Sequence, residues 1–243
     1  FTYPEFMSDG VRLNKYLASC GVGSRRACDA MVLAGDVVVN GQSCIKPSYR
    51  VQPDDQIRAN GKRIEPLSIQ SIVLHKPAGL VCTRNDERHR ETIYHLLPGR
   101  MQHLMHVGRL DLESEGLIIL SNDGELSQAL THPKHKIPKV YHVTLDSSFE
   151  NEIFDKLLKG VYTEEGKAKA HSVERISSRR LQIVLTTGMK RQIRYMMQAV
   201  HHRVKRLIRL QIGPLKLGSL RSGKWRPLAD QEREDLLKMA EQK

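Results

Sequence analysis

The sequence lacks any long apolar run. No segment approaches the roughly 18 apolar residues that mark a membrane-spanning helix. The beginning of the chain also lacks the pattern of a secretory signal peptide. We therefore expect a cytoplasmic protein, without a membrane partner, whose 40% of hydrophobic residues form an ordinary core.

Cysteine is scarce, and no pair of cysteines has metal-ligand spacing. The pairs His103/His106 and His201/His202 likewise have no thiol or carboxylate at such spacing. We therefore expect no metal site, histidines that face solvent or nucleic acid, and free, buried thiols at the four cysteine positions. Those positions are Cys20, Cys28, Cys44 and Cys82.

Acidic residues are absent from one long segment. From Arg175 to Ala229 the chain has 14 Lys or Arg residues and no Asp or Glu, and its formal net charge is +12. Because like charges repel, a folded one-sign stretch favours an external counter-charge, and phosphate is the usual one. A merely basic, soluble surface is the alternative. An anionic membrane fits less well, because the stretch contains strand-like segments.

The chain divides by pattern into a small block and a large one. Residues 1–10 read as a leader, since residues 1–6 precede Met7 and look like an expression remnant. We predict a first domain over residues 11–65, a linker over 66–70 and a second domain over 71–243.

In the first block, apolar spacing predicts a helix over residues 12–19. Ser24 is a good N-cap for a second helix, which we expect to bury Ala27, Ala30, Met31 and, less firmly, Leu33. A strand over 37–39 and Asn-Gly turns at 40–41 and 60–61 complete the block.

The second block mixes strands and helices without regular β-α-β alternation. Strands are predicted from Ile72 and over 140–145 and 181–185, with helices over 190–200 and from Asp230. This pattern indicates an α+β fold with a largely antiparallel sheet flanked by helices.

Arg25 and Arg26 occupy the first turn of the second predicted helix, where the helix dipole disfavours cations. A bound phosphate would reverse that penalty, and Arg12 and Lys15 on the preceding helix would extend the patch. The alternative is that these side chains simply point to water. The segments at 12–17, 21–27 and 35–41 resemble the α-L RNA-binding domain named for ribosomal protein S-four, which favours the RNA-binding interpretation.

Asp111 lies between apolar residues, and spacing alone favours a turn or capping role for it. Its segment, Gly-Arg-Leu-Asp-x-x-Ser-x-Gly-Leu at 108–117, however, resembles the catalytic motif of the RsuA-like ribosomal RNA pseudouridine synthases, with their RluB, RluE and RluF relatives. Segments that resemble further family motifs follow in the expected order. They lie at 76–79, 139–141, 188–194, 212–215 and 223–226.

The resemblance implies an isomerase that needs no cofactor, because pseudouridine formation involves no redox change. It implies that Asp111 is the essential group, acting covalently or by proton abstraction at the ribose, and that Tyr141 stacks on the flipped uracil. It makes Arg194 the cation that keeps Asp111 ionised, with Lys190 one turn earlier on the same helix face.

Further candidate substrate contacts are Arg109, Lys190, Arg191 and Leu207, although core packing explains Leu207 equally well. The resemblance predicts a structured RNA as partner, ribosomal RNA above all, with large-subunit RNA favoured, and we expect a monomer. Tyr195 departs from the family, whose members often carry a second basic residue after the Gln-Ile-Arg run.

Two other functions were weighed. A non-catalytic RNA-binding or ribosome-assembly factor would keep the basic patches, but it would need none of Asp111, Tyr141 and Arg194. A nucleic-acid hydrolase would need a metal-binding carboxylate cluster, and the acidic residues converge on no such motif.

Overall fold

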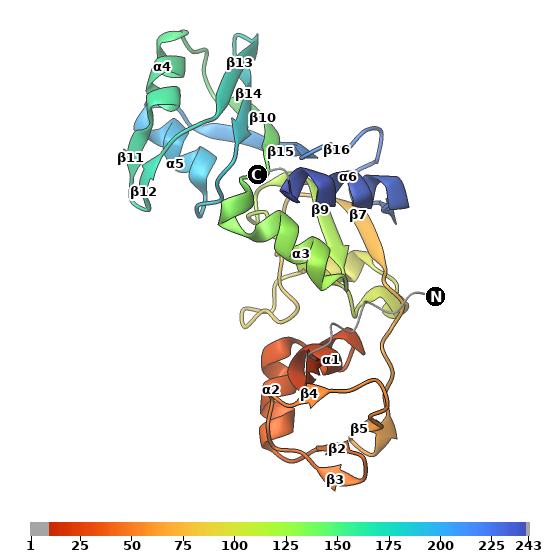
Figure 1. Cartoon of the computed structure of the whole chain (residues 1–243). Coiled ribbons are helices and arrows are strands. Elements are labelled where there is room, and N and C mark those ends of the chain that lie inside the picture. The colour runs from red at the N-terminus through yellow and green to blue at the C-terminus, as the bar shows by residue number, and fades with distance from the viewer. Residues whose placement is uncertain (1–9, 242–243) are drawn as a thin grey trace. The chain divides into compact units, whose positions relative to one another are not determined.

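The computed structural model describes residues 10–241 and divides the chain into two compact units, one ending at Gln70 and one beginning at Ser71 (Figure 1). The leader predicted over residues 1–10 thus lies, apart from Gly10, outside the described residues.

The first unit packs two helices on short antiparallel strands. Strand β1 pairs with β4, and a second sheet has the order β3-β2-β5-β6. The elements are β1 (Val11–Arg12), α1 (Leu13–Ser19), α2 (Arg25–Leu33), β2 (Val37–Val39), β3 (Gln42–Ser43), β4 (Arg50–Val51), β5 (Ile57–Ala59) and β6 (Lys62–Arg63).

The predicted start of α2 and both predicted hairpins are confirmed. The Ser24 hydroxyl accepts a hydrogen bond from the Ala27 amide at 3.2 Å. The Asn-Gly pairs that join β2 to β3 and β5 to β6 have positive φ throughout, which suits a two-residue turn.

The predicted buried side of α2 was wrong for Ala27, Ala30 and Leu33, whereas Met31 packs, partly buried, against the core of this unit. Cys28 and Val32 are the buried residues of the helix, whereas Ala27 and Ala30 are exposed and Leu33 is 65% exposed. The apolar stripe is narrow, so the contact with α1, rather than the sequence pattern, sets which side faces inward. Of the four free cysteines, only Cys28 and Cys82 are fully buried.

The second unit is built on a nine-stranded sheet of order β13-β14-β10-β15-β9-β7-β17, with β16 added to β15 and β8 to β9. Every pairing in it is antiparallel except that of β15 with β9. The predicted α+β class with a mixed, largely antiparallel sheet is therefore confirmed.

The strands of this unit are β7 (Ser71–Lys76), β8 (Met105–Val107), β9 (Glu115–Ser121), β10 (Lys139–Leu145), β11 (Val161–Thr163), β12 (Gly166–Ala168), β13 (Ser172–Ser177), β14 (Arg180–Leu185), β15 (Val204–Ile212), β16 (Leu215–Lys216) and β17 (Trp225–Pro227). The helices are η1 (Ile93–Leu96), η2 (Gly99–Met101), α3 (Gly124–Thr131), η3 (Pro133–His135), α4 (Glu152–Lys159), α5 (Gln192–Ala199) and α6 (Asp230–Glu241).

Strands β7 and β9 are buried on both faces, because alternate side chains enter two separate cores. Ile118 and Leu120 of β9 join the core that includes residues of α4 and α5. Leu117 and Ile119 join the core that includes residues of α3 and α6. Helices therefore cover both faces of the central strands.

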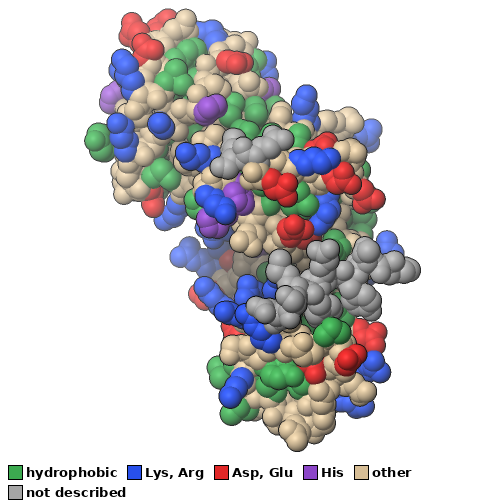
Figure 2. All heavy atoms as spheres, in the orientation of Figure 1, with side chains coloured by type: hydrophobic (Ala, Val, Ile, Leu, Met, Phe, Trp, Pro, Cys, Tyr) green, Lys and Arg blue, Asp and Glu red, His purple; other side chains and the backbone are tan. Residues whose placement is uncertain are grey.

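Asp123 ties α3 to α6. Its carboxylate caps α3 by accepting hydrogen bonds from the amides of Glu125 and Leu126, and it forms an ion pair with Arg233 of α6 at 2.6 Å. A cap of this kind contributes about 1 kcal/mol. Figure 2 shows acidic side chains gathered over α6 on this face of the unit.

Candidate active site

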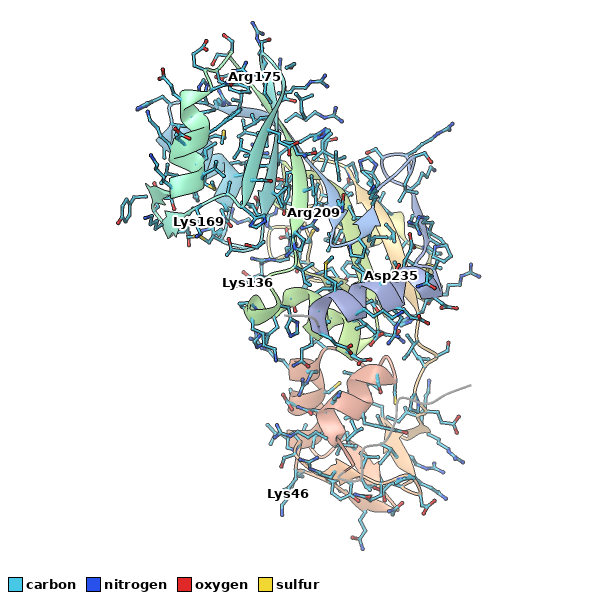
Figure 3. All side chains as sticks on the ribbon, turned by 45° about the horizontal axis from the view of Figure 1, so that its top comes forward. Lys46, Lys136, Lys169, Arg175, Arg209 and Asp235 are labelled. Carbon is cyan, nitrogen blue, oxygen red and sulfur yellow. The ribbon has the colours of Figure 1, made fainter. Side chains whose placement is uncertain are left out.

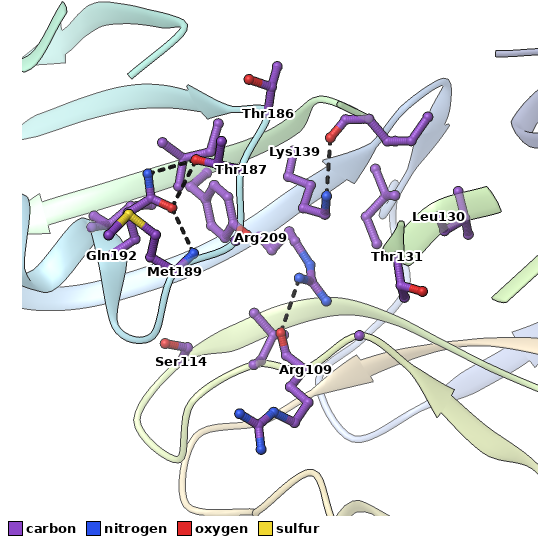
Figure 4. A pocket seen from close by; sticks show the side chains of 18 of the residues that line it. Arg109, Ser114, Leu130, Thr131, Lys139, Thr186, Thr187, Met189, Gln192 and Arg209 are labelled. Carbon is purple, nitrogen blue, oxygen red and sulfur yellow. Dashed lines mark hydrogen bonds between the residues drawn. The ribbon is translucent and has the colours of Figure 1, made fainter. Parts of the chain in front are cut away.

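A pocket of about 420 Å³ opens in the second unit where segments far apart in the sequence meet (Figure 4). Such a volume suits a small ligand the size of a nucleoside. The lining comes from the loop before β9, the end of α3, the start of β10, the loop between β14 and α5, and β15. Of the candidate residues, it contains Arg109, Asp111, Tyr141, Lys190, Arg191 and Leu207.

Strand register places two of these residues, Tyr141 and Leu207. Tyr141 on β10 pairs across the sheet with Arg209 on β15, and Leu207 pairs with Val143. Tyr141 is 8% exposed and Leu207 is 4% exposed, so each presents only a small surface to the pocket.

A close approach of β9 to β15 brings the Asp111 loop to the same place. Gly116 on β9 pairs in parallel with Arg209, and its φ is +109°. A Cβ atom at this position would collide with the backbone N and O atoms of Arg209. Only glycine fits here, and the loop that precedes it therefore meets β15 directly.

Lys76 holds the Asp111 loop through hydrogen bonds to backbone carbonyls. This lysine is fully buried, and its amine donates to the carbonyl oxygens of Leu112 at 3.3 Å, Ser114 at 2.7 Å and Pro77 at 2.9 Å. Burial lowers the pKa of Lys76. Because three acceptors satisfy the buried amine, its role is to hold the loop in one conformation.

Two arginines, one on β15 and one on α5, also donate hydrogen bonds to the backbone of this loop. Arg209 donates through Nη1 to the Arg109 carbonyl at 3.4 Å and through Nε to the Leu117 carbonyl at 2.7 Å. Arg194 on α5 donates through Nη2 to the Glu113 carbonyl at 3.2 Å. Cations from three elements thus contact the backbone on both sides of Asp111, which holds the carboxylate in a defined position.

Arg194 has Glu113, not Asp111, as its ion-pair partner. Its Nε lies 3.3 Å from Glu113 Oε2, and Arg191 Nη2 lies 3.0 Å from the same oxygen. Burial lowers the pKa of Arg194, and the Glu113 carboxylate opposes that shift. Arg194 is outside the pocket lining and contacts the Asp111 loop two residues further along the chain.

Lys190 is not on the helix that carries Arg194, contrary to our expectation. Helix α5 begins at Gln192, because Arg191 adopts a left-handed conformation with φ of 48°. The Gln192 side chain holds the preceding turn by accepting a hydrogen bond from the Met189 amide and pairing with the Thr187 hydroxyl (Figure 4). Lys190 lies in that turn, with its amine 3.7 Å from Glu165.

Lys139 begins the segment at 139–141 that resembles a family motif, and it was not predicted as a site residue. It also lines the pocket beside Arg209. Its amine donates to the Ile137 carbonyl at 3.1 Å. Burial, with a smaller contribution from the charge of Arg209, lowers the pKa of Lys139 to about 8.

Other groups were also missed by sequence reasoning. A signal existed for Lys76, since a lysine that ends an otherwise apolar strand must find acceptors when it is buried. No sequence signal identified Glu113 or Arg209, whose partners lie 81 and 92 residues away in the chain.

The idea that the basic stretch from Arg175 to Ala229 needs an external counter-charge was too broad. Five of its 14 cations form ion pairs with carboxylates from outside the stretch. Except for Arg226 with Glu232, the pairs join residues far apart in the sequence and could not be read from the local charge pattern. These five are Lys190, Arg191, Arg194, Arg206 and Arg226.

His106 was expected to face solvent or nucleic acid, and instead it is partly buried. Its ring lies 6.4 Å from that of Tyr94, its Nδ1 bonds to the Gly108 carbonyl, and burial lowers its pKa. Within residues 10–241, no three His, Cys, Asp or Glu side chains cluster as metal ligands would. In the same part of the chain, no helix is long and apolar enough to span a membrane.

The first unit exposes the four cations that were predicted to bind RNA. Arg25 and Arg26 lie in the first turn of α2, Lys15 is on α1, and Arg12 is the residue before α1 rather than on it. The first turns of α1 and α2 contain no acidic residue.

Two protein families match the chain. The family described as "RNA pseudouridylate synthase" matches residues 70–199, and the S4 domain matches residues 11–57. The S4 match implies RNA binding by the first unit.

Similar proteins cover nearly the whole chain. "Ribosomal large subunit pseudouridine synthase B" of Bacillus subtilis is 32% identical, covering 95% of this chain and 97% of that protein. "Dual-specificity RNA pseudouridine synthase RluF" of Escherichia coli is 34% identical, covering 95% and 80%. A solved structure of a pseudouridylate synthase has a TM-score of 0.69 and 28% identity, covering 93% of this chain and all of that one.

This chain therefore belongs to the RNA pseudouridine synthases, a family of isomerases, and carries an RNA-binding S4 domain ahead of its catalytic domain.

Proposed function

We propose that the enzyme converts a specific uridine in ribosomal RNA to pseudouridine, with large-subunit RNA as the favoured substrate and Asp111 as the catalytic residue. The observation that carries the proposal is the pocket itself. Asp111, Tyr141 and Leu207 come from three separate segments and line one cavity of about 420 Å³. The names of the Bacillus subtilis and Escherichia coli relatives support the choice of RNA.

Asp111 acts on the ribose of the target uridine. The reaction breaks the bond from uracil N1 to ribose C1′ and forms a bond from C5 to C1′, while the C5 hydrogen leaves as a proton and N1 takes up a proton from solvent. Attack on C1′ and removal of a ribose proton both use an ionised carboxylate. The loop contacts of Lys76 and Arg209 support either route, because they hold that carboxylate in place.

Tyr141 and Leu207 form the surface that receives the base. The target nucleotide must leave its stack to reach Asp111, which costs a few kcal/mol and is cheapest in a loop or bulge. The ring of Tyr141 stacks on the flipped uracil, and Leu207 packs against it. Arg109 and Arg191 lie at the same pocket and contact the RNA around the flipped nucleotide.

Arg194 acts through the loop. Its ion pair with Glu113 and its hydrogen bond to the Glu113 carbonyl set the position of the segment two residues after Asp111. Arg194 is therefore a positioning residue. In the first unit, the exposed cations at 12, 15, 25 and 26 bind RNA phosphates and hold the substrate.

Mapping of pseudouridines tests the choice of RNA. Cells that lack the gene should lose pseudouridine at one or a few positions of large-subunit RNA. Expression of the wild-type protein should restore them, and expression of Asp111→Asn should not. Loss confined to transfer RNA, with every ribosomal pseudouridine retained, would contradict the proposed substrate.

A further inference from the structure

Lys139 and Arg209 are the two pocket-lining cations of the described residues that are not exposed and have no acidic partner. Figure 3 places Arg209 in the interior of the second unit, among its strands, and Figure 4 shows Lys139 and Arg209 projecting into the same pocket. Both residues line it together with Asp111. Within residues 10–241, neither cation forms an ion pair with a carboxylate.

Arg209 is only 3% exposed, yet its guanidinium is incompletely bonded. Nε and Nη1 donate to the carbonyls of Leu117 and Arg109, but Nη2 is buried and has no hydrogen-bond acceptor. A buried donor without an acceptor costs about 1–3 kcal/mol, and more for a charged group. Structural bonding alone therefore does not explain why a guanidinium is present here.

Lys139 adds a second cation to the same wall of the pocket. Its amine has one protein acceptor, the Ile137 carbonyl, and burial, with a smaller contribution from the nearby charge of Arg209, lowers its pKa. Lys76 is an internal contrast, because its buried amine has three carbonyl acceptors. Two adjacent cations with spare donors favour an anionic ligand.

We propose that Lys139 and Arg209 bind a phosphodiester group of the RNA next to the target uridine. The inference rests on the proposed function, since a nucleotide that enters this pocket to reach Asp111 brings its 5′ and 3′ phosphates with it. A guanidinium with a free Nη2 and an adjacent amine match the oxygens of a phosphate. The two residues set the depth at which the nucleotide is held.

Lys139→Met tests the contact, with Lys139→Arg as the charge-preserving partner. The probe is a large-subunit RNA transcript labelled with tritium at uridine C5, and filter binding is measured between roughly 50 and 200 mM salt. We expect Lys139→Met to raise KM about tenfold, to change kcat less than about threefold, and to reduce the salt slope of binding by about one. Lys139→Arg should restore the wild-type KM and the wild-type salt slope.

Lys238→Met is the matched control, because Lys238 is an exposed lysine of α6 outside the pocket. It should leave KM and the salt slope unchanged. Values for Lys139→Met equal to those of the control would overturn the inference. So would a loss confined to kcat, because it would place Lys139 in the chemistry or the fold rather than at a phosphate.

A second arm separates the phosphate from the base. An oligonucleotide that spans the mapped uridine receives one neutral methylphosphonate linkage, 5′ or 3′ to that uridine. One of the two positions should weaken wild-type binding by the same factor as Lys139→Met does, and the two losses should not add. Full additivity at both positions, or no loss at either, would overturn the phosphate contact.

The experiments distinguish failure of the proposed function from failure of the phosphate contact. If the wild-type protein releases no tritium from ribosomal RNA, the proposed substrate fails, while the binding arms still report on the phosphate contact. If the wild-type protein turns over and Lys139→Met is indistinguishable from it, the inference alone fails.

Arg209→Gln is expected to lower the thermal stability, because the bond to the Leu117 carbonyl is lost with the guanidinium. The Lys139 variants keep the test independent of that effect.

Discussion

Arg194 and Arg209 approach the Asp111 loop from opposite sides, and they differ in how their charge is balanced. Arg194 has a carboxylate partner in the chain, Glu113, at 3.3 Å. Arg209 is more deeply buried and has only carbonyl partners, with Nη2 left unbonded. Both fix the backbone, and each has one buried nitrogen without a hydrogen-bond acceptor, Nε in Arg194 and Nη2 in Arg209, but only Arg209 lines the pocket.

The difference separates two roles that a charged residue can have in one site. A cation paired within the chain positions its neighbours and is complete before substrate arrives. A cation that lines the pocket without an acidic partner and without enough protein acceptors can be completed by an anion of the ligand. The contrast assigns Arg194 to the geometry of Asp111, and Arg209 with Lys139 to substrate binding.

Among these predictions, the largest effect is expected from substituting Arg194, and it is an effect on kcat. Arg194→Gln removes the ion pair to Glu113 and the charged donor to its carbonyl, so the Asp111 loop loses a fixed contact. A displacement of about 1 Å can cost about a hundredfold in rate. We expect kcat to fall about ten- to a hundredfold with little change in KM, measured by tritium release.

Glu113→Gln sharpens this prediction, because it keeps the backbone carbonyl and the shape of the side chain. It should lower kcat less than Arg194→Gln does, and the double variant should be no worse than Arg194→Gln alone. An increase in KM with unchanged kcat in Arg194→Gln would instead assign Arg194 to substrate binding. The proposed difference in role between Arg194 and Arg209 would then be wrong.

RNA binding by the pair Lys139 and Arg209 should depend on pH, because Lys139 titrates. The pKa of Lys139 is lowered to about 8, so the free protein loses this proton as the pH rises through 8. The amine is charged below that value and neutral above it. We therefore expect wild-type affinity for RNA to fall by up to about tenfold between pH 7 and pH 9.

Two variants isolate Lys139 in this titration. Lys139→Met should show a flat profile at low affinity, and Lys139→Arg a flat profile at high affinity. The other charged groups of the pocket are present in all three proteins, so their titration cancels in the comparison: Arg109, Asp111, His132, Lys136, Lys190, Arg191 and Arg209. Parallel profiles for wild type and Lys139→Met would contradict the assignment.

The smallest effect is expected in the first unit, whose cations are exposed rather than buried. Replacing Arg25 and Arg26 with Ala should weaken RNA binding about fivefold and reduce its salt slope by up to about two, with kcat unchanged at saturating RNA. A matched double variant, Lys62→Ala with Arg63→Ala on β6, removes the same charge from the same unit. Equal losses in both would show that only net charge matters.

The sequence allowed prediction of those features that depend on neighbouring residues. The cap at Ser24, the Asn-Gly turns at 40–41 and 60–61, and the three predicted strands β7, β10 and β14 follow from local chemistry. The motif resemblance identified Asp111 and Tyr141, and Leu207 was a candidate that core packing explained equally well. All three line one pocket, to which strand register brings Tyr141 and Leu207.

Features that depend on distant contacts could not be predicted. The buried side of α2 is set by its packing on α1, and the left-handed conformation of Arg191 excludes Lys190 from α5. The ion pair of Arg194 with Glu113 joins residues 81 apart in the chain. Local periodicity carries no information about such pairs, so the balance of charge around Asp111 became visible only in the folded chain.

The most direct test of the account compares Asp111→Asn with the wild-type enzyme on tritium-labelled ribosomal RNA. The substitution keeps the size of the side chain and removes its charge. We predict that tritium release falls by at least about a thousandfold while RNA affinity stays within about twofold of wild type. Release at the wild-type rate by Asp111→Asn would contradict the assignment of Asp111 as the catalytic residue.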